Sequence, residues 1–468
     1  MVTHKTWEKN LLIKYLCPRD FRRGEMEKKM EINVLNSVVV VLLCAMTAFI
    51  SHMGMAVFHD GIRPVIPEYI EGRMHRSEMA SVAFGLSVGF IASVGIGNAL
   101  ATNLLNPWLL FLATDIIGIA SPKKWIAPIL GGLWGILCLT GIGTVNAVLT
   151  GVPIDLIGAL GQLGTYVVTG FALFPIIAII VQFGMKKGII AAVVTILFRF
   201  VGPMFSTISG DSWTMLVGIV LLLAFCIHED VKNKAHLESD ELEGNVFSER
   251  VARIRKNLPF LMAAGALIAV ACNVHVFAGS DVTMFDLSKA YALGNTAESQ
   301  AIIHTAAVNE FMRALSFIPL IATTAVTTGV YGVAGFTFVY VAGYVCPNPI
   351  VAALAGAVII LVEVMILGYI GKYLGKFPSI RSASDNIRSS MNTCVELALL
   401  IGSINASCVM GSSTNVGAAG GFIITALIYL INEATGRKIM RMAIGPIGAI
   451  ATGLILNILH LVGIVTLL

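Results

Sequence analysis

From residue 33 to its end, the chain is a near-continuous series of apolar blocks, each about long enough to cross a lipid bilayer. A hydrocarbon core ~30 Å thick needs about 20 apolar residues per helix, and such windows recur throughout. Hydrophobic residues make up 57% of the chain and charged residues only 12%, where soluble domains carry roughly 25% charged residues. Backbone amides in lipid need partners within the protein, and the runs lack the alternation of a membrane β-barrel. We therefore predict an all-α, polytopic helical membrane protein with about 11–14 transmembrane helices.

The distribution of Lys and Arg divides the chain into two halves. Basic residues concentrate in every second loop between candidate spans, which include 107–120 and 328–346, and such loops are expected on the cytoplasmic side. The hydrophilic stretch 229–257 then forms a cytoplasmic loop between a first transmembrane half, 33–228, and a second, 258–468. An odd number of spans in each half would orient the halves oppositely, as in inverted-repeat transporters, although they share no convincing sequence match.

Residues 1–32 form a polar N-terminal segment that differs from the rest of the chain. Two further methionines, Met26 and Met30, lie near its end. The run Arg22–Met26 can be encoded by a purine-rich stretch resembling a bacterial ribosome-binding site. We therefore expect that translation naturally begins at Met26 or Met30.

Sequence motifs for metal binding and catalysis are missing. The eight cysteines are scattered, mostly in apolar runs, without a CxxC pair or a His/Cys cluster, which is typical of small core residues. The chain has no HExxH motif, no paired Asp ligands and no Ser/His nucleophile arrangement, which argues against an intramembrane enzyme. We therefore predict no catalytic residues, metal or cofactor. With a modest net charge of +4, we also expect no nucleic-acid partner.

The densest group of polar residues within an apolar run comprises His304, Asn309, Glu310 and Arg313. A charge at the bilayer centre costs about 2.5–3.5 kcal/mol on insertion scales, so each one needs a reason. Glu310 and Arg313 are three residues apart, share one face of a helix and can pair. They mark either a substrate or proton site inside the bundle, or a self-satisfied ion pair at the outer end of a helix.

A second group, His59, Asp60 and Arg63, follows the first predicted span. Gly61 permits unusual backbone angles, and Pro64 disfavours a helix at the residues before it. A broken segment that carries a carboxylate, an imidazole and a guanidinium can bind an anion or gate an entry. The alternative is a solvated cytoplasmic loop.

Asp115 and Glu363 each interrupt an apolar run near its middle. Carboxylates in such positions can take up protons or hold Na+, because burial makes their ionisation depend on a partner. The alternative is a protonated carboxyl group that is hydrogen-bonded across a helix interface.

Runs of small and hydroxyl-bearing residues supply the remaining candidates. Thr323 and Thr324 lie in such a run ahead of Gly329, where a transporter helix can unwind and offer free carbonyls, or where helices simply approach closely. Asp385 and Asn386 lie in a hydroxyl-rich inner segment with two Arg residues. That segment either receives an anion or a partner protein, or is a plain loop.

Several segments of the chain resemble the YhfT family, a family of bacterial inner-membrane proteins expected to be transporters. The resemblance covers essentially everything after about residue 33. It is carried by AVFHDGIRP (56–64), AFGLS (83–87), NLP (257–259), FIPLIATT (317–324), AGFTFVY (334–340) and ASDNIR (383–388). The resemblance implies a multi-pass membrane protein, and it transfers no substrate and no catalytic residue.

These observations favour a secondary transporter of a small polar metabolite, anionic or zwitterionic, that works by alternating access in the bacterial inner membrane. Glu310, Asp115 or Glu363 would couple transport to H+ or Na+, and Arg313 or Arg63 would pair with a substrate carboxylate or phosphate. The alternative is the membrane permease component of a phosphotransferase system, which needs a separate phospho-carrier protein. The expected partners are the lipid bilayer, the substrate and the coupling ion, and a homodimer is also compatible with the sequence.

Overall fold

Helices form almost all of the regular structure in the computed structural model, which describes residues 33–233, 241–374 and 376–468. Eleven helical segments of these residues are long and apolar enough to cross a membrane, or twelve if the bent pair Val246–Lys256 and Leu258–Asn273 counts as one span. The expected all-α, polytopic membrane fold is therefore confirmed. The N-terminal segment 1–32, with its alternative start sites, lies outside the described residues.

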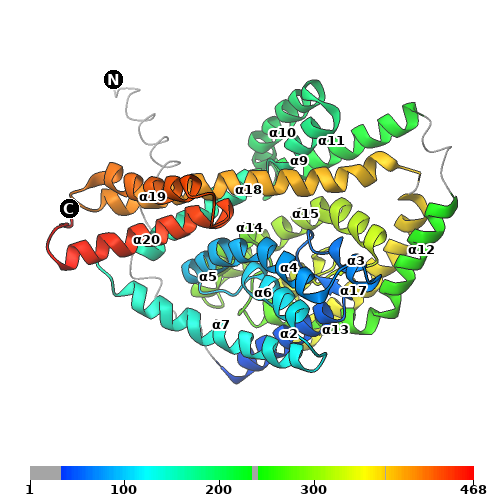
Figure 1. Cartoon of the computed structure of the whole chain (residues 1–468), viewed down its shortest axis with the longest axis horizontal. Coiled ribbons are helices and arrows are strands. Elements are labelled where there is room, and N and C mark those ends of the chain that lie inside the picture. The colour runs from blue at the N-terminus through cyan, green and yellow to red at the C-terminus, as the bar shows by residue number, and fades with distance from the viewer. Residues whose placement is uncertain (1–32, 234–240, 375) are drawn as a thin grey trace.

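The described elements follow one another in two series, and Figure 1 labels most of the helices. The first series is α2 (Val34–His52), β1 (Ala56–Val57), α3 (Val65–Ile70), α4 (Arg76–Phe90), the π-helix η1 (Ile91–Gly95), α5 (Ile96–Thr102), α6 (Pro107–Ala120), α7 (Ile126–Thr150), α8 (Leu156–Phe171), α9 (Phe174–Phe183), α10 (Met185–Phe205) and α11 (Gly210–Lys232). The second series is α12 (Glu241–Lys256), α13 (Leu258–Asn273), α14 (Asp281–Ala292), α15 (Ala297–Thr328), β2 (Tyr331–Gly332), α16 (Phe338–Val345), α17 (Pro349–Leu374), α18 (Pro378–Ser412), α19 (Gly417–Ala434) and α20 (Arg441–Leu461).

Three segments differ from their expected structure. The expected span 107–120 is α6, whose 14 residues reach only about 21 Å at 1.5 Å per residue, less than a hydrocarbon core. The expected span 328–346 contains a strand and the eight-residue helix α16. The stretch 229–257, expected as a loop, holds the end of α11 and the helix α12, which packs against α17 and α15.

Short helices start at defined caps inside the protein. Asn106 caps α6 by accepting a hydrogen bond from the backbone N–H of Leu109 at 2.9 Å, and Pro107 occupies the first helical position, where no N–H is needed. At the end of α15, Gly329 adopts a φ of 67°, a left-handed conformation that glycine reaches without a side-chain penalty. Helix α15 therefore ends just before β2.

Two short extended pairings join the halves inside the protein, between residues that are all buried. Strand β1 pairs in parallel with β2, in the register Ala56 to Tyr331. A second bridge joins Leu105, just before α6, to Phe277, just before α14. Each half therefore contributes two helix interruptions, and each interruption meets one from the other half.

The order of helix packing is repeated in the two halves. Helix α2 packs on α6 and α7 as α13 packs on α16 and α17, and α10 packs on α11 as α19 packs on α20. Helices α8 and α18, which hold the same place in their halves, pack against each other. The two halves are thus built on one plan, which the residue identities do not reveal.

The helices form two bundles, and each bundle takes helices from both halves. The large bundle comprises α2–α7 and α12–α17, and the small bundle comprises α8–α11 and α18–α20. Figure 1 shows α18, α19 and α20 running across one side of the large bundle. Relatively few helix pairs connect the bundles, among them α15 with α18 and α5 with α8. The interface between the bundles is therefore the natural place for relative movement.

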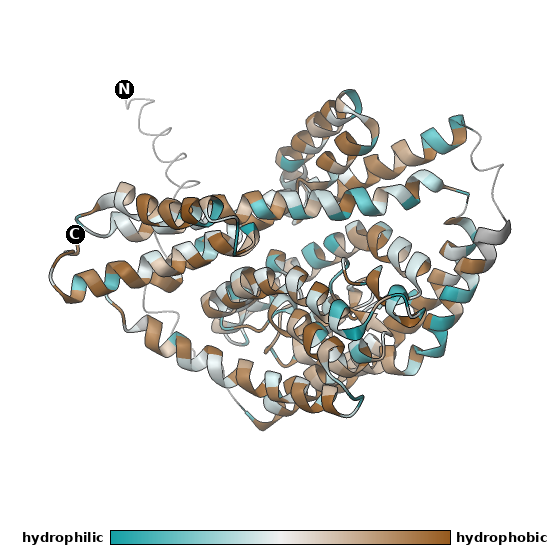
Figure 2. Cartoon of the chain, in the orientation of Figure 1, coloured by the Kyte–Doolittle hydropathy of each residue, from teal (hydrophilic) through white to brown (hydrophobic). Residues whose placement is uncertain are grey.

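The outer surface suits a lipid environment. Large apolar side chains are exposed along α10 and α17, and Figure 2 shows hydrophobic residues along most long helices. Hydrophilic residues gather on α12 and at helix ends in the same view. This distribution supports a multi-pass membrane protein.

Candidate functional site

A cavity of about 130 Å³ lies between the large and small bundles, where the interrupted segments of the two halves converge. Both strands lead into it: the segment after β1 lines one part, and the segment after β2 lines another. The start of α14 and residues of α8 and α18 complete the wall. Its aromatic lining residues are Phe58, Phe90, Trp108, Phe171, Phe317 and Tyr340.

The segment after β1 contributes a buried ion pair. Nη2 of Arg63 lies 2.7 Å from Oδ1 of Asp60, and the Arg63 side chain is only 3% exposed. His59 precedes the pair, and its Nδ1 accepts a hydrogen bond from the backbone N–H of Gly61 at 2.9 Å. The imidazole ring also lies edge-on to Phe90, with 5.9 Å between the centroids. The three predicted residues of this segment therefore line the cavity rather than a solvated loop.

Glu310 and Arg313 form the predicted pair on α15, inside the protein. Nε of Arg313 donates to Oε1 of Glu310 at 2.8 Å, Nη2 forms an ion pair with the same oxygen, and Nη2 also donates to Thr337 at 3.0 Å. The other oxygen of Glu310 accepts hydrogen bonds from the hydroxyls of Ser280 and Thr283. Arg313 lines the cavity, whereas Glu310 lies behind it and holds the guanidinium in place.

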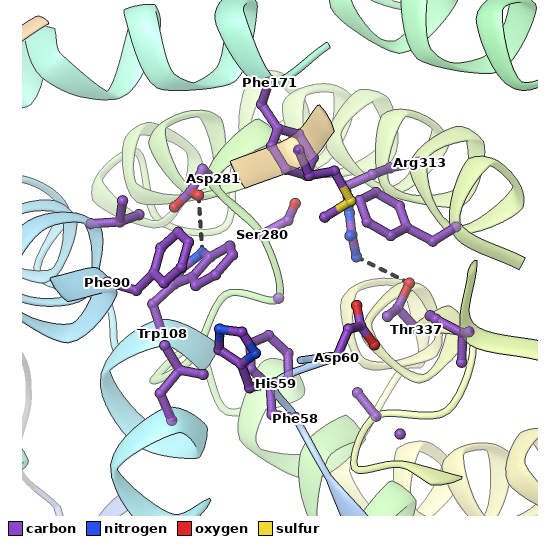
Figure 3. A pocket seen from close by; sticks show the side chains of 18 of the residues that line it. Phe58, His59, Asp60, Phe90, Trp108, Phe171, Ser280, Asp281, Arg313 and Thr337 are labelled. Carbon is purple, nitrogen blue, oxygen red and sulfur yellow. Dashed lines mark hydrogen bonds between the residues drawn. The ribbon is translucent and has the colours of Figure 1, made fainter. Parts of the chain in front are cut away.

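Asp281 places a second carboxylate in the wall, at the first residue of α14. Its Oδ1 accepts from the side-chain amide of Asn98 at 2.6 Å, and its Oδ2 accepts from the indole N–H of Trp108 at 3.0 Å. Trp108 stacks on Phe90 with 5.0 Å between the ring centroids. Figure 3 shows Asp281 beside these rings on one side of the cavity, and Arg313 with Thr337 on the other.

Arg388 on α18 brings a third guanidinium to the cavity from the small bundle. Its Nη1 pairs with Asp385 at 2.9 Å, and its Nη2 donates to the hydroxyl of Thr324 at 3.3 Å. The Asp385 side chain is 76% exposed, and Asn386 donates to Gln182 on α9. The inner hydroxyl-rich segment is thus the start of α18 and contributes Arg388 to the site, rather than either predicted residue.

Asp115 supports the segment after β1 from behind the cavity. One carboxylate oxygen accepts from the backbone N–H groups of Phe58 and His59 at 2.8 and 3.0 Å. The other accepts from the hydroxyl of Ser51 at 2.7 Å. Asp115 is fully buried and fixes the backbone of two lining residues.

Glu363 on α17 supports the segment after β2 in a similar way. Its Oε2 accepts from the hydroxyl of Tyr331 at 2.8 Å and from the backbone N–H of Phe336 at 2.9 Å. Its Oε1 is buried and has no hydrogen-bond partner among the described residues. Both carboxylates that interrupt apolar runs therefore hold an interrupted segment rather than lining the cavity.

Three predicted residues lie elsewhere. His304 is exposed, and Asn309 accepts from the backbone N–H of Ser209 ahead of α11. The hydroxyl of Thr323 donates back to the carbonyl of Pro319 within α15. Asn309 and Thr323 therefore have structural contacts, and none of the three residues lines the cavity.

Sequence reasoning missed several residues of the wall. Asp281 follows a short apolar run and resembles the start of an ordinary polar loop, and Trp108 resembles one of the aromatic residues common at membrane interfaces. Their contact joins positions 173 apart in the chain, which no local pattern signals. Within the described ranges, no group of three or more His, Cys, Asp or Glu side chains is arranged to hold a metal ion.

Comparisons with known proteins identify the family that the chain resembles. The model of the YhfT family, described as "Protein of unknown function", matches residues 36–465. The chain is 49% identical to "Uncharacterized protein YhfT" of Escherichia coli (strain K12) over 429 residues, 91% of this chain and 98% of that protein. No solved structure matches the chain significantly.

Proposed function

We propose, for this chain, which belongs to the YhfT family, that it is a secondary transporter of a small polar metabolite in the bacterial inner membrane. The observation that carries the proposal is the cavity between the two bundles, whose wall holds three guanidinium groups and two carboxylates. Keeping each charge at membrane depth costs about 2.5–3.5 kcal/mol, so such a concentration of charged groups around a cavity favours a binding site.

The arrangement of the breaks supports alternating access. Secondary transporters bind substrate where interrupted helices of two structural repeats meet, near the middle of the bilayer. Here β1 meets β2, and both lead into the cavity. We propose that the halves are inverted repeats and that the small bundle moves against the large one, opening the cavity to each side in turn. The repeated packing order and the sparse connection between the bundles support this mechanism.

Coupling to H+ or Na+ is proposed through the carboxylates next to the cavity. Glu310 holds Arg313, Asp115 holds the segment after β1, and Glu363 holds the segment after β2. An ionised carboxylate accepts hydrogen bonds on both oxygens. A protonated carboxyl group carries an O–H donor and can accept fewer hydrogen bonds. Protonation of one of these groups would therefore change the wall of the cavity and its affinity for substrate.

Uptake by purified protein in proteoliposomes tests the proposal. Radiolabelled amino acids, carboxylic acids and inorganic phosphate are presented separately, with and without an imposed inward proton or sodium gradient. We expect saturable uptake of one class, stimulated by one gradient. Absence of uptake for all three classes would overturn the proposed function, and uptake that ignores both gradients would remove the coupling. Uptake that requires a phosphorylated carrier protein and releases a phosphorylated product would instead identify a phosphotransferase permease.

A pair of variants connects the flux to the cavity. Arg313→Lys keeps a positive charge beside Glu310 but loses the planar, two-pronged donor, and we expect uptake to fall at least about tenfold. Arg437→Gln removes an arginine that lies just after α19, is 56% exposed and is paired with Glu433, and this variant serves as the control. Equal uptake by Arg313→Lys and the unmodified protein would place the substrate elsewhere.

A further inference from the structure

We infer that the cavity accepts a compact zwitterion the size of a small α-amino acid, with its ammonium group at Asp281 and its carboxylate on the guanidinium side. This inference rests on the proposed function only in taking the cavity as the substrate site. It goes further by choosing between anionic and zwitterionic substrates and by assigning an orientation.

The charges around the cavity argue against a multiply charged anion. Arg63, Arg313 and Arg388 are each paired with a carboxylate, of Asp60, Glu310 and Asp385 respectively. Asp281 adds a carboxylate to the wall that forms no ion pair among the described residues. A phosphate dianion would add two negative charges to a low-dielectric interior in which every arginine of the wall already has a carboxylate partner. A zwitterion adds no net charge and can satisfy groups of both signs.

The charges are also separated in space, which gives the site two poles. Asp281 stands beside Phe90 and Trp108, and Arg313 lies across the cavity from it (Figure 3). Each Asp281 oxygen accepts one hydrogen bond, so lone pairs remain for an ammonium group. The neighbouring aromatic faces attract a cation and pack against an apolar side chain. This pole therefore suits an amine attached to a small hydrocarbon body.

The opposite pole offers hydrogen-bond donors without partners. Nε and Nη2 of Arg313 are engaged by Glu310 and Thr337, whereas Nη1 has no hydrogen bond among the described residues. Nε of Arg63 and the hydroxyl of Tyr340 are buried and unpartnered within the same part of the chain. Buried donors without acceptors are costly, and a carboxylate can accept from several at once. This pole therefore suits the carboxylate of the same ligand.

The volume limits the ligand to a small molecule. An apolar cavity of ~150 Å³ in another protein holds benzene, which has six non-hydrogen atoms. The present cavity, of about 130 Å³, is slightly smaller and therefore suits a ligand of roughly six non-hydrogen atoms. Alanine and similarly small α-amino acids match this size, and larger sugar phosphates do not.

Thermal stability of the purified protein with matched probes tests the inference, because a ligand that binds only the folded state raises the apparent melting temperature. Alanine is compared with propionate and ethylamine, leucine with 4-methylpentanoate and 3-methylbutylamine, and inorganic phosphate is tested alone. We expect at least one of the two zwitterions to stabilise the protein more than its singly charged analogues and phosphate. Equal or greater stabilisation by a carboxylate, an amine or phosphate, or no stabilisation by either zwitterion, would overturn the inference.

A single substitution separates the two poles. Asp281→Asn removes the charge while keeping the shape, and we expect it to weaken zwitterion binding by about tenfold to a hundredfold. Binding of the matching carboxylate is expected to stay the same or improve, which shows that the variant is folded. Asp286→Asn, at an exposed position on the same helix and outside the cavity wall, is the matched control. Unchanged zwitterion binding by Asp281→Asn would contradict the assigned orientation.

Transport separates this inference from the proposed function. Zwitterion binding without flux in proteoliposomes would contradict the transporter and leave the ligand assignment intact. Flux of an anion that is indifferent to Asp281→Asn would support the transporter and overturn the ligand assignment.

Discussion

The two interrupted segments that meet at β1 and β2 are each held by a buried carboxylate, but they differ in the charged groups that they carry and in how that carboxylate is bonded. Behind the first segment, both oxygens of Asp115 accept hydrogen bonds, and the segment itself carries the Arg63–Asp60 ion pair. Behind the second segment, only Oε2 of Glu363 is engaged, while Oε1 is buried without a partner among the described residues. The first segment is thus equipped to bind a charged ligand, and the second is equipped to respond to a proton.

This difference assigns separate roles to the two carboxylates. A proton on Oε1 of Glu363 leaves the two hydrogen bonds to Oε2 in place, so this group can change its charge without releasing its segment. A proton on Oδ2 of Asp115 competes with the two backbone N–H groups that this oxygen accepts, and a proton on Oδ1 lies next to the Ser51 hydroxyl that donates to it. Among these two groups, we therefore propose Glu363 as the coupling carboxylate and Asp115 as a structural support.

The largest expected effect is on stability at the first segment. Asp115→Leu keeps the branched shape and the number of side-chain non-hydrogen atoms but leaves the N–H groups of Phe58 and His59 without an acceptor, and each buried unsatisfied group costs about 1–3 kcal/mol. We expect the free energy of unfolding to fall by about 3–5 kcal/mol in SDS titrations of the protein in mixed micelles. Asp115→Asn can still accept from both N–H groups and is the control, expected within about 1 kcal/mol of the unmodified protein. A small effect of Asp115→Leu would show that the segment is held by other contacts.

A second prediction probes the backbone of the other segment. Gly335 has a φ of 56°, and an added Cβ would collide with the Oε2 atom of Glu363. Left-handed geometry costs a non-glycine residue roughly 1–2 kcal/mol, and displacing the carboxylate adds to that, so Gly335→Ala is expected to lose about 2–4 kcal/mol of unfolding free energy. Gly72→Ala is the matched control, because Gly72 has a φ of 75° and open space around its Cβ position. Equal losses for the two variants would mean that the contact with Glu363 contributes nothing.

The sequence predicted the membrane fold well because its signal is local. A span of about 20 apolar residues is visible in any window, and the Glu310–Arg313 pair follows from a spacing of three on one helix. Even so, the sequence could not place that pair at the cavity, because its surroundings include Ser280 and Thr337, which come from other elements. Local spacing therefore predicted which groups pair, but not what they face.

The rest of the site depends on contacts between distant segments. Asp281 gains its role from Asn98 and Trp108, and Asp115, within α6, gains its role from the backbone of Phe58 in a distant helix interruption. Gly61 and Pro64 made the interruption after β1 visible in the sequence, whereas the interruption around β2 consists mainly of apolar residues, which is why 328–346 was expected to be one helix. Backbone breaks of this kind are stabilised by tertiary partners, and a hydropathy window does not detect them.

The third prediction concerns coupling rather than stability. Glu363→Gln keeps an acceptor for Tyr331 and Phe336, so we expect a loss of less than about 1 kcal/mol of unfolding free energy. It removes the exchangeable proton, and uptake driven by an inward proton gradient should therefore fall to the level measured without a gradient. Asp115→Asn, which alters the other supporting carboxylate, is expected to keep its response to the gradient. The assignment of roles would have to be reversed if Asp115→Asn lost that response and Glu363→Gln kept it.

The smallest expected effect is at the connection between the bundles. Thr324→Val removes the acceptor for Nη2 of Arg388 at 3.3 Å, while the pair between Arg388 and Asp385 remains. One long hydrogen bond to a charged group contributes little, so we expect a change in unfolding free energy of about 1 kcal/mol or less. If the bond holds the bundles together in one state only, its loss shifts the balance between states and changes the KM for uptake by up to about threefold.

Thr323→Val, whose hydroxyl is bonded only within α15, is the control and is expected to leave the KM unchanged. Identical KM values for the two variants would show that Arg388 does not hold the small bundle through Thr324, and movement between the bundles would then have to be controlled by the other contacts of α18.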